Sequence, residues 1–263
     1  MDLGIKNRVA VVTASSRGLG RAVAEALAAE GARLAVCARD RDGIAATGRF
    51  IKKEYGVDVL YESCDVSRAD DVRRFAESVA AEYGTAHILF ANAGGPPPGR
   101  VGDFAPEDYE RAIGLNTMST IRLVDSFLPL MRKAGWGRII ASASVTVKQP
   151  LPALALSNVS RAGVVAYIKT VAREYASTGI TANTVAPGYI YTDRVKQILD
   201  ERVEREGLSF DEAMKRLAAS IPAGRIGTTK EFASLVAFLA SEQAGYINGE
   251  TILIDGGQYQ GLM

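Results

Sequence analysis

The order of apolar segments is the feature that most constrains the fold of this chain. Short runs rich in β-branched residues alternate with longer helical patterns from one end of the 263 residues to the other. The short runs show no polar alternation, which is typical of strands that are buried on both faces. Buried strands that are separated by helices indicate a parallel sheet. We therefore expect an α/β fold, with a doubly wound parallel sheet of about seven strands and helices on both faces.

The expected elements follow from hydrophobic periodicity and from helix caps. Strands are expected at 9–13, 34–38, 57–61, 87–91, 138–141, 180–185 and 251–254. Helices are expected at 20–30, in a stretch that ends near 55, after residue 67, and around 106–132, 155–177 and 229–240. Ser67 with Asp70, and Thr228 with Glu231, have the spacing of a capping box at a helix start.

The chain is expected to form one domain over residues 1–263. No internal repeat, low-complexity tract or proline-rich linker divides it. The segment 193–221 stands apart because it is charged and helix-prone and lies between the sixth and seventh strands. We interpret it as an inserted helical flap at the substrate.

Charge and hydropathy exclude several classes of partner. Lysine and arginine number 31 against 30 acidic residues, so the formal net charge is only +1. Nucleic acids and anionic membranes both need a concentrated positive field, and neither is expected as a partner. No apolar run approaches the ~18 residues of a membrane span. The start, Met1 to Gly4, lacks the features of a secretory signal, so we expect a cytoplasmic protein.

Cysteine and histidine are too scarce for a disulfide framework or a common zinc site. The only cysteines, Cys37 and Cys64, fall in apolar stretches and are interpreted as small buried hydrophobic residues. His87 is the only histidine, which excludes Ser-His-Asp hydrolysis unless His87 is itself the base. It opens a strand, so we interpret it as a partly exposed structural residue. No metal site is expected.

A glycine-rich turn follows the first strand and precedes a helix. It has the sequence TASSRGLG over residues 13–20. A phosphate group needs converging backbone N–H groups at a helix N-terminus with no side chain in the way, and Gly18 and Gly20 supply that clearance. Val23 stands where the third glycine of a dinucleotide fingerprint would be. The turn alone therefore suits either a phosphate site or an ordinary helix start.

Four more segments extend this pattern in the order and positions of one known family. They are Ala91–Gly94 after the fourth strand, Asp65-Val66 after the third, Pro187–Thr192 after the sixth, and Asp255–Gly257 near the end. With the glycine-rich turn they make the chain similar, over nearly its whole length, to the short-chain dehydrogenase/reductase family. Within that family it most resembles 3-oxoacyl-carrier-protein reductases and sugar dehydrogenases. The resemblance implies a Rossmann-type fold and an oxidoreductase with a nicotinamide coenzyme.

The resemblance also implies which residues bind the coenzyme. They are Thr13, Ser15, Ser16, Arg17, Gly18, Leu19, Gly20, Arg39, Asp65, Val66, Asn92, Ala93, Gly94, Arg161, Pro187, Gly188, Ile190 and Thr192. Ala14 replaces the first glycine of the family's turn, and a Cβ is tolerable there wherever φ is negative.

The charge at the end of the second strand selects the coenzyme. An acid there would bind the ribose 2′-hydroxyl of NAD, and a base would accept the 2′-phosphate of NADP. Arg39 ends the strand and Arg17 lies in the glycine-rich turn, so two guanidinium groups could hold a dianion. Asp40 is the rival, one residue farther along. We expect NADP, with NAD as the alternative.

The catalytic residues match the family only in part. By resemblance Ser144 would polarise the substrate oxygen and Asn116 would order a water molecule. The family's Tyr-x-x-x-Lys pair is replaced by Ser157 and Arg161. No tyrosine of the chain has Lys or Arg four residues later.

This replacement removes the usual proton donor. A phenol has a pKa near 10 that an adjacent cation can lower, whereas an aliphatic hydroxyl is a far weaker acid. Arg161 can hold ribose hydroxyls and supply positive potential, but it cannot release a proton at working pH. A water molecule between Ser157 and Arg161 could relay the proton. Lys148, Tyr189 or Tyr191 could instead be the acid, although each is more simply a structural residue. Tyr189 and Lys196 have the spacing of the enoyl-reductase variant, which we attribute to chance.

Two functions remain open from the sequence. The first is an NADP-dependent oxidoreductase that moves hydride between the coenzyme and a ketone or secondary alcohol. The second is an NADP(H)-binding sensor or assembly protein without turnover. The helix expected at 158–176 is apolar nearly all round. Burial of such a helix on both sides implies a homodimer or homotetramer.

Overall fold

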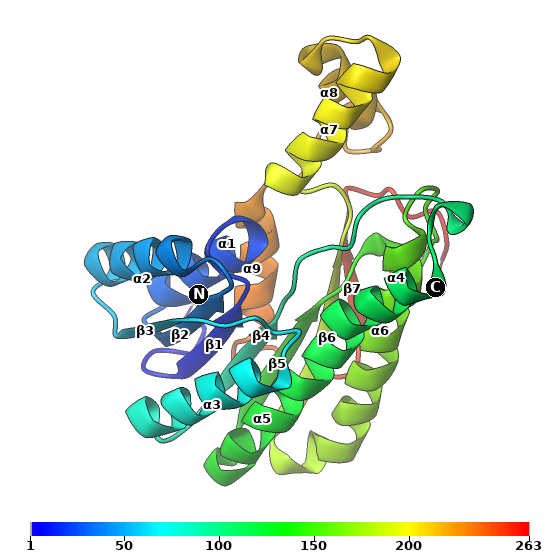
Figure 1. Cartoon of the computed structure of the whole chain (residues 1–263). Helices are drawn as coiled ribbons and strands as arrows, with labels where there is room; N and C mark the ends of the chain where they lie inside the picture. Colours follow the sequence, from blue (N-terminus) through cyan, green and yellow to red (C-terminus); the bar gives the residue numbers. More distant parts are fainter. Residues whose placement is uncertain (1, 263) are drawn as a thin grey trace.

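The computed structural model describes residues 2–262, and within them seven strands form one parallel sheet (Figure 1). The strand order is β3-β2-β1-β4-β5-β6-β7. The strands are β1 (Val9–Thr13), β2 (Arg33–Ala38), β3 (Val59–Ser63), β4 (Ile88–Ala91), β5 (Gly137–Ser142), β6 (Ile180–Pro187) and β7 (Thr251–Ile254). All six strand pairings are parallel. The expected doubly wound Rossmann-type fold is confirmed.

Helices cover both faces of this sheet. The α-helices are α1 (Gly18–Ala29), α2 (Arg41–Tyr55), α3 (Ala69–Tyr83), α4 (Pro106–Ile113), α5 (Ser119–Ala134), α6 (Ala155–Tyr175), α7 (Asp193–Glu206), α8 (Phe210–Ala219) and α9 (Thr229–Leu239). Helices α1, α2 and α9 contribute to one buried cluster and α3, α5 and α6 to another. Along β1, Ala10 and Val12 enter the first cluster while Val9 and Val11 enter the second. Both faces of the strand are therefore apolar, which explains why its sequence shows no polar alternation.

The order of connection reverses at the centre of the sheet. From β1 the chain moves outward through β2 to β3, and then returns to place β4 on the other side of β1. The loops that follow β1 and β4 diverge, so a crevice opens at the carboxyl ends of these two strands. Thr13 and Asn92 hold its two sides together. The Thr13 hydroxyl donates to the Asn92 carbonyl oxygen at 2.7 Å and accepts from the Asn92 N–H at 2.9 Å.

Three expectations need correction. The third strand begins at Val59 and not at Val57. The helix expected over 106–132 consists of α4 and α5 joined by a π-helical turn, Gly114–Met118. Ser67 does not cap α3, because its N–H and its hydroxyl both donate to the Asp65 carboxylate in a local turn.

Other local expectations are confirmed. The capping box of Thr228 and Glu231 is present at the start of α9. Cys37 and Cys64 are buried free thiols. His87 is half-buried, and its Nδ1 accepts from the Val9 N–H at 3.0 Å. This acceptor role requires an unprotonated Nδ1, and burial together with the nearby arginines, such as Arg8, lowers the pKa of the imidazole.

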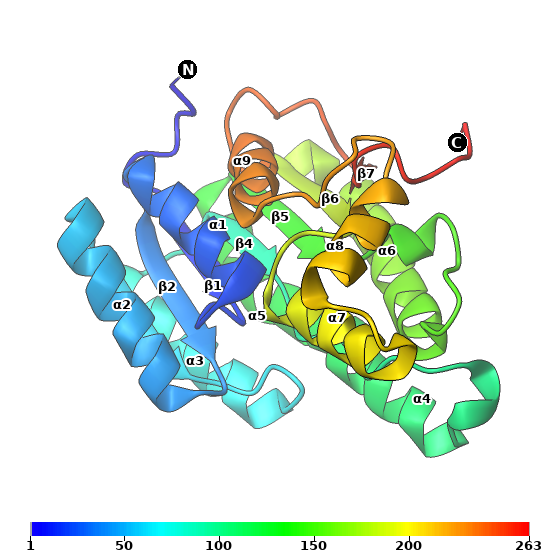
Figure 2. The same ribbon diagram turned by 90° about the horizontal axis from the view of Figure 1, so that it is seen from above.

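The segment 193–221 contains α7 and α8, which project beyond the end of the sheet (Figure 1). Seen from above, the two helices lie between α1 and α6 (Figure 2). They share a small cluster of their own, formed by Val195, Leu199, Ala213 and Leu217. No helix within residues 2–262 is long and apolar enough to cross a membrane.

The glycine-rich turn holds a strained alanine. Ala14 has a φ of +50°, so the condition under which a Cβ is tolerated at this position is not met. Its carbonyl oxygen lies so close to Gly20 that a Cβ on Gly20 would clash with it. The close approach brings the start of α1 against the end of β1, and Ala14 takes a left-handed conformation that costs an L-residue about 1 kcal/mol or more.

We expect Ala14→Gly to raise the free energy of unfolding by about 0.5–1 kcal/mol, because glycine adopts a positive φ without the Cβ clash. Ala46→Gly is the matched control, since Ala46 is exposed in the middle of α2 and glycine there should cost about 1 kcal/mol. Urea unfolding of both variants measures the difference. Equal losses of stability in the two variants would contradict the strain at Ala14.

Candidate active site

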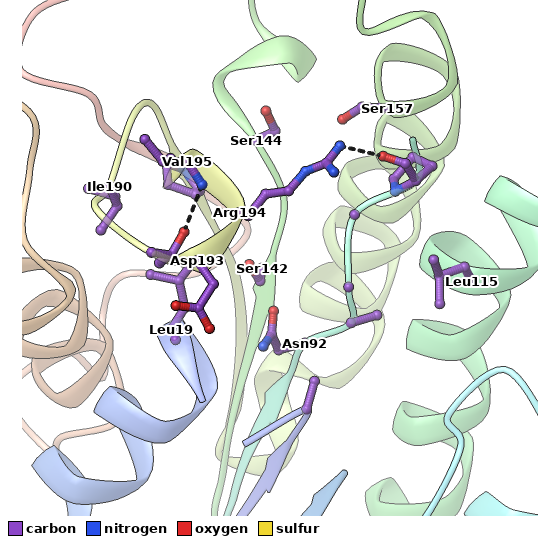
Figure 3. A pocket seen from close by; sticks show the side chains of 18 of the residues that line it. Leu19, Asn92, Leu115, Ser142, Ser144, Ser157, Ile190, Asp193, Arg194 and Val195 are labelled. Carbon is purple, nitrogen blue, oxygen red and sulfur yellow. Dashed lines mark hydrogen bonds between the residues drawn. The ribbon is translucent and has the colours of Figure 1, made fainter. Parts of the chain in front are cut away.

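A cavity of about 610 Å³ opens at the carboxyl edge of the sheet. Its wall is formed by the segments at the ends of β1 to β6 and by α7. Figure 3 shows the side chains that enter it from these elements. The cavity is therefore the crevice created by the reversal of strand order, covered on its outer side by the first turns of α7.

Most of the site residues expected from the sequence line this cavity. They are Ser16, Arg17, Gly18, Leu19, Arg39, Asp65, Val66, Asn92, Ala93, Gly94, Ser144, Ser157, Arg161, Pro187, Gly188, Ile190 and Thr192. Four expected residues lie behind its wall: Thr13, Ser15, Gly20 and Asn116. The first three shape the glycine-rich turn, since the Ser15 hydroxyl donates to carbonyl oxygens of Val12 and Cys37 at 3.1 and 3.2 Å.

The start of α1 is open to an anion. Arg17 occupies the N-cap position, and its side chain makes no capping hydrogen bond. The first N–H groups of α1 therefore have no side-chain acceptor, and they face a region where the helix dipole favours negative charge. A phosphate group at this helix start would satisfy them.

Arg17 and Arg39 lie with acidic residues at the end of the cavity beside β2. Arg39 is exposed and lines the cavity. Asp40 also lines it, but its carboxylate accepts from the Gly43 N–H at 3.1 Å as the N-cap of α2. The Arg17 guanidinium pairs with Asp193 at 3.5 Å across an exposed gap to α7. Asp40 is thus committed to a helix cap, whereas both guanidinium groups remain accessible.

Ser144 and Ser157 lie at the opposite end of the cavity (Figure 3). Ser144 follows β5, and its Oγ accepts from the Thr146 N–H at 3.2 Å. Because this contact uses an oxygen lone pair, the Ser144 hydroxyl hydrogen is free to be donated to a ligand oxygen. Ser157 lies in the first turn of α6 and is half-buried.

Arg161 is a buried cation without a carboxylate. It lies one turn after Ser157 on α6 and is 8% exposed. Its Nη1 donates to the Ser142 carbonyl oxygen at 3.0 Å, and within residues 2–262 no acid lies at ion-pair distance. Burial lowers the pKa of the guanidinium to about 10, which still leaves it charged near neutral pH. Arg161 therefore presents unsatisfied donors and a positive charge to the cavity.

Asn116 lies in the π-helical turn between α4 and α5 and is buried. Its Nδ2 donates to the Gly94 carbonyl oxygen at 3.1 Å, and its Oδ1 accepts from the Ser160 hydroxyl at 2.9 Å. Both ends of the amide have partners in the protein, so the side chain connects the end of β4 to α6. π-helical turns are frequent at functional sites. We treat Asn116 as a positioning residue, which differs from the water-ordering role expected from the sequence.

The other candidate acids are poorly placed. Tyr189 lines the cavity, but its ring packs against the α7–α8 cluster and burial raises the pKa of its hydroxyl. Tyr191 is 47% exposed, and neither it nor Lys148 lines the cavity. Lys196 is exposed, pairs with Asp200 and also lies outside the cavity. None of these four residues is placed to act as the proton donor that the family's tyrosine provides.

The sequence did not identify several polar residues of the cavity, among them Ser142, Asp193, Arg194 and Gln197. Arg194, the second residue of α7, lines the cavity and donates from Nη2 to the Pro96 carbonyl oxygen at 3.0 Å. Apolar residues missed as well are Leu115, Leu151, Leu154, Val195 and Ile198. No local pattern identifies them, because which apolar side chains line the cavity depends on how segments far apart in the chain come together.

Comparisons with known proteins identify similar sequences over nearly the whole chain. The family model described as "Enoyl-(Acyl carrier protein) reductase" matches residues 13–258. The 3-oxoacyl-[acyl-carrier-protein] reductase of Escherichia coli is 35% identical over 257 residues, which covers 98% of this chain and 99% of that protein.

Solved structures extend the likeness to the whole fold. The L-sorbose reductase of Gluconobacter frateurii, complexed with NADPH and L-sorbose, is 34% identical, with a TM-score of 0.96 and 100% of each chain covered. An NADPH-bound short chain oxidoreductase of Pseudomonas aeruginosa PAO1, described as containing an atypical catalytic center, is 30% identical. Its TM-score is 0.91, with 98% of this chain and 99% of that chain covered.

We expect Arg161→Met to raise the free energy of unfolding by about 1–2 kcal/mol, because it removes a buried charge that has no counter-charge. Arg138→Met is the matched control. Arg138 is also buried, but its guanidinium donates to carbonyl oxygens of Ser241, Gly137 and Gly179. Losing it should cost about 2–3 kcal/mol. Denaturant unfolding measures both changes, and a loss of stability in Arg161→Met would contradict the account of an unpaired cation.

Proposed function

The chain belongs to the short-chain dehydrogenase/reductase family, and on that premise we propose that it is an NADP-dependent oxidoreductase. The proposed reaction moves a hydride between the nicotinamide and a ketone or secondary alcohol. The observation that carries the proposal is the continuous cavity, which runs from two accessible arginines, past an open helix N-terminus, to a serine hydroxyl that is free to donate.

The residues of the cavity suit a dinucleotide phosphate. The approach of Gly20 to the Ala14 carbonyl leaves no room for a side chain, so the turn can lie directly against a pyrophosphate. Arg39 and Arg17 would hold the 2′-phosphate, and Arg161 would donate to ribose hydroxyls with the N–H groups that Ser142 leaves free. When bound, the coenzyme supplies the hydride. The relatives complexed with NADPH support this assignment.

The proposed roles at the reacting end follow from hydrogen-bond geometry. In the reduction the carbonyl carbon of the substrate gains a hydride and its oxygen gains a proton. Ser144 donates to that oxygen and stabilises the negative charge that develops on it. A water molecule held between Ser157 and Arg161 gives a proton to that oxygen and takes one up from solvent in its place, and the charge of Arg161 lowers the pKa of that water. Asn116 holds the end of β4 and helix α6 in a fixed position relative to each other around the site.

The presence of Ser157 where the family has its tyrosine favours a second candidate function. An NADP(H)-binding sensor or assembly protein would keep the coenzyme residues and would not need a strong proton donor. Under this alternative Ser144 and Arg161 serve only to hold the coenzyme. Turnover with a panel of ketones separates the two functions.

Assembly, location and domain organisation belong to the same proposal. The α6 helix exposes Val159, Ala162 and Ala166, with Val159 at 49%, and this apolar strip supports a homo-oligomer. We propose that the chain works as one domain, with α7 and α8 as the flap over the substrate. The cytoplasmic location remains a prediction.

We expect NADPH to bind about 10- to 100-fold more tightly than NADH, because the 2′-phosphate gains charge-assisted hydrogen bonds from two arginines. Arg39→Ala and Arg17→Ala should each remove about a tenfold share of this preference and leave NADH binding unchanged. Asp40→Asn is the control, since its side chain caps α2 and should not change the preference. Fluorescence titration gives the dissociation constants, and equal affinities for the two coenzymes in the wild type would refute the assignment.

We expect Ser144→Ala to lower kcat for ketone reduction by about 100-fold or more, because one donor to the developing oxyanion is lost. The double variant Ser157→Tyr with Arg161→Lys should raise kcat by about tenfold or more, since a phenol beside a cation is a better acid. Ser157→Phe with Arg161→Lys supplies the ring without the hydroxyl and should not raise it. Turnover that is absent in the wild type and does not appear in the double variant would favour the sensor.

A further inference from the structure

The charges that line the cavity are segregated along its length. Its acidic residues are Asp40, Asp65 and Asp193. Each already has a partner: the Gly43 N–H for Asp40, Ser67 for Asp65, and Arg17 for Asp193. All three lie toward the glycine-rich turn and the ends of β2 and β3. No carboxylate among the lining residues reaches the end that holds Ser144 and Ser157.

Two consecutive residues of α7 point to opposite ends of this cavity. Asp193 is directed toward the start of α1, where Leu19 lies, and it pairs with Arg17 (Figure 3). Arg194 extends the other way, and its guanidinium lies at the end where Ser144 and Ser157 are found (Figure 3). The two charges of α7 are thus divided between the nucleotide end and the reacting end.

Arg194 keeps most of its donors free. Its Nη2 donates to the Pro96 carbonyl oxygen, and the described residues provide no other hydrogen bond or ion pair to its guanidinium. The bond to Pro96 holds one corner of the planar group, and its remaining N–H groups have no acceptor among the described residues. A guanidinium in this state matches the geometry of a carboxylate, which it can bind through two parallel hydrogen bonds.

The surroundings of Arg194 limit what the rest of the ligand can be. Leu151 and Leu154 line the cavity from the segment before α6, and Leu115 lines it from the π-helical turn before α5. Helix α7 contributes Ile198 and one further polar side chain, the neutral amide of Gln197. Together with Arg161, the reacting end therefore presents positive charge and an apolar wall. A neutral polyhydroxy ketone would leave that wall without an apolar partner and Arg194 without a counter-charge.

We propose that the substrate is a small oxo acid, or the corresponding hydroxy acid, whose carboxylate binds Arg194 while its carbonyl oxygen meets Ser144. The short carbon chain lies against the leucines. Arg194 is then the residue that determines substrate specificity, and its bond to Pro96 connects α7 to the loop after β4 around the bound acid. The inference rests on the proposed function for the use of the cavity, but it concerns the substrate end alone.

The test measures binding without chemistry. Protein saturated with NADP⁺ is titrated by calorimetry with 3-oxohexanoate, with its methyl ester and with L-sorbose, none of which can be reduced by the oxidised coenzyme. We expect the acid to bind at least about tenfold more tightly than the ester or the sugar, since only the acid forms a charge-assisted pair. If NADP⁺ does not bind, the same titration of the free protein tests the carboxylate site, and the proposed function fails separately.

Three variants test whether Arg194 causes the preference for the acid. Arg194→Met should bring the acid-to-ester ratio of affinities close to one by weakening the acid, with the affinity for NADP⁺ changed by less than about threefold. Lys196→Met is the matched control, because it removes one cation from the same helix outside the cavity, and it should keep the wild-type ratio. Arg194→Lys should keep part of the preference.

Three outcomes would overturn the inference. The acid-to-ester ratio could be unchanged in Arg194→Met. That variant could weaken NADP⁺ as strongly as the acid, which would assign Arg194 to the coenzyme. L-sorbose could bind more tightly than the acid. If the acid binds through Arg194 but NADPH is not oxidised in its presence, the carboxylate site stands and the proposed hydride transfer is what fails.

Discussion

The reversal of strand order between β1 and β4 is the constraint on which the rest of the structure depends. It separates the loops at the centre of the sheet, and the hydrogen bonds between Thr13 and Asn92 keep the two sides of the crevice at a fixed distance. The glycine-rich turn, Ser144 and α7 all occupy the edge that this reversal opens. A parallel sheet without the reversal would have offered no site where a long ligand could contact the ends of six strands.

Two residues at this edge lower the free energy of unfolding of the protein. Ala14 is held in a left-handed conformation so that α1 can start against β1, and Arg161 is buried with a single carbonyl partner. Local costs of this kind concentrate at functional sites, where they are compensated by the surrounding packing. The apolar clusters on both faces of the sheet provide that packing. The cavity thus combines a strained backbone with a buried positive charge that has no counter-charge among the described residues.

The sequence predicts most of the fold because the signals are local and strong. Uninterrupted apolar runs identify the central strands, and Thr228 with Glu231 marks the start of α9. The edge strand β3 is placed two residues too early, since it is only partly buried and its pattern is weak. Ser67 is misassigned because one carboxylate, that of Asp65, competes successfully for its hydroxyl.

The candidate site is predictable only where a motif fixes a residue's place. Ser144, Ser157 and Arg161 are located by their position in the family pattern, and they do line the cavity. The partners of Asn116 and the lone bond of Arg194 depend on contacts between segments far apart in the chain. No spacing rule reveals such contacts. The flap could be recognised as charged and helical, but the direction of its side chains required the folded structure.

The most direct test of the account follows a single atom. The protein is incubated with NADPH that carries deuterium at both hydrogen positions of the nicotinamide C4, together with a ketone or oxo acid, and the product is analysed by NMR and mass spectrometry. The account predicts an alcohol with one deuterium on the carbinol carbon, on one face only, despite the missing phenol. Tight binding of NADPH with no deuterium in any product would contradict it.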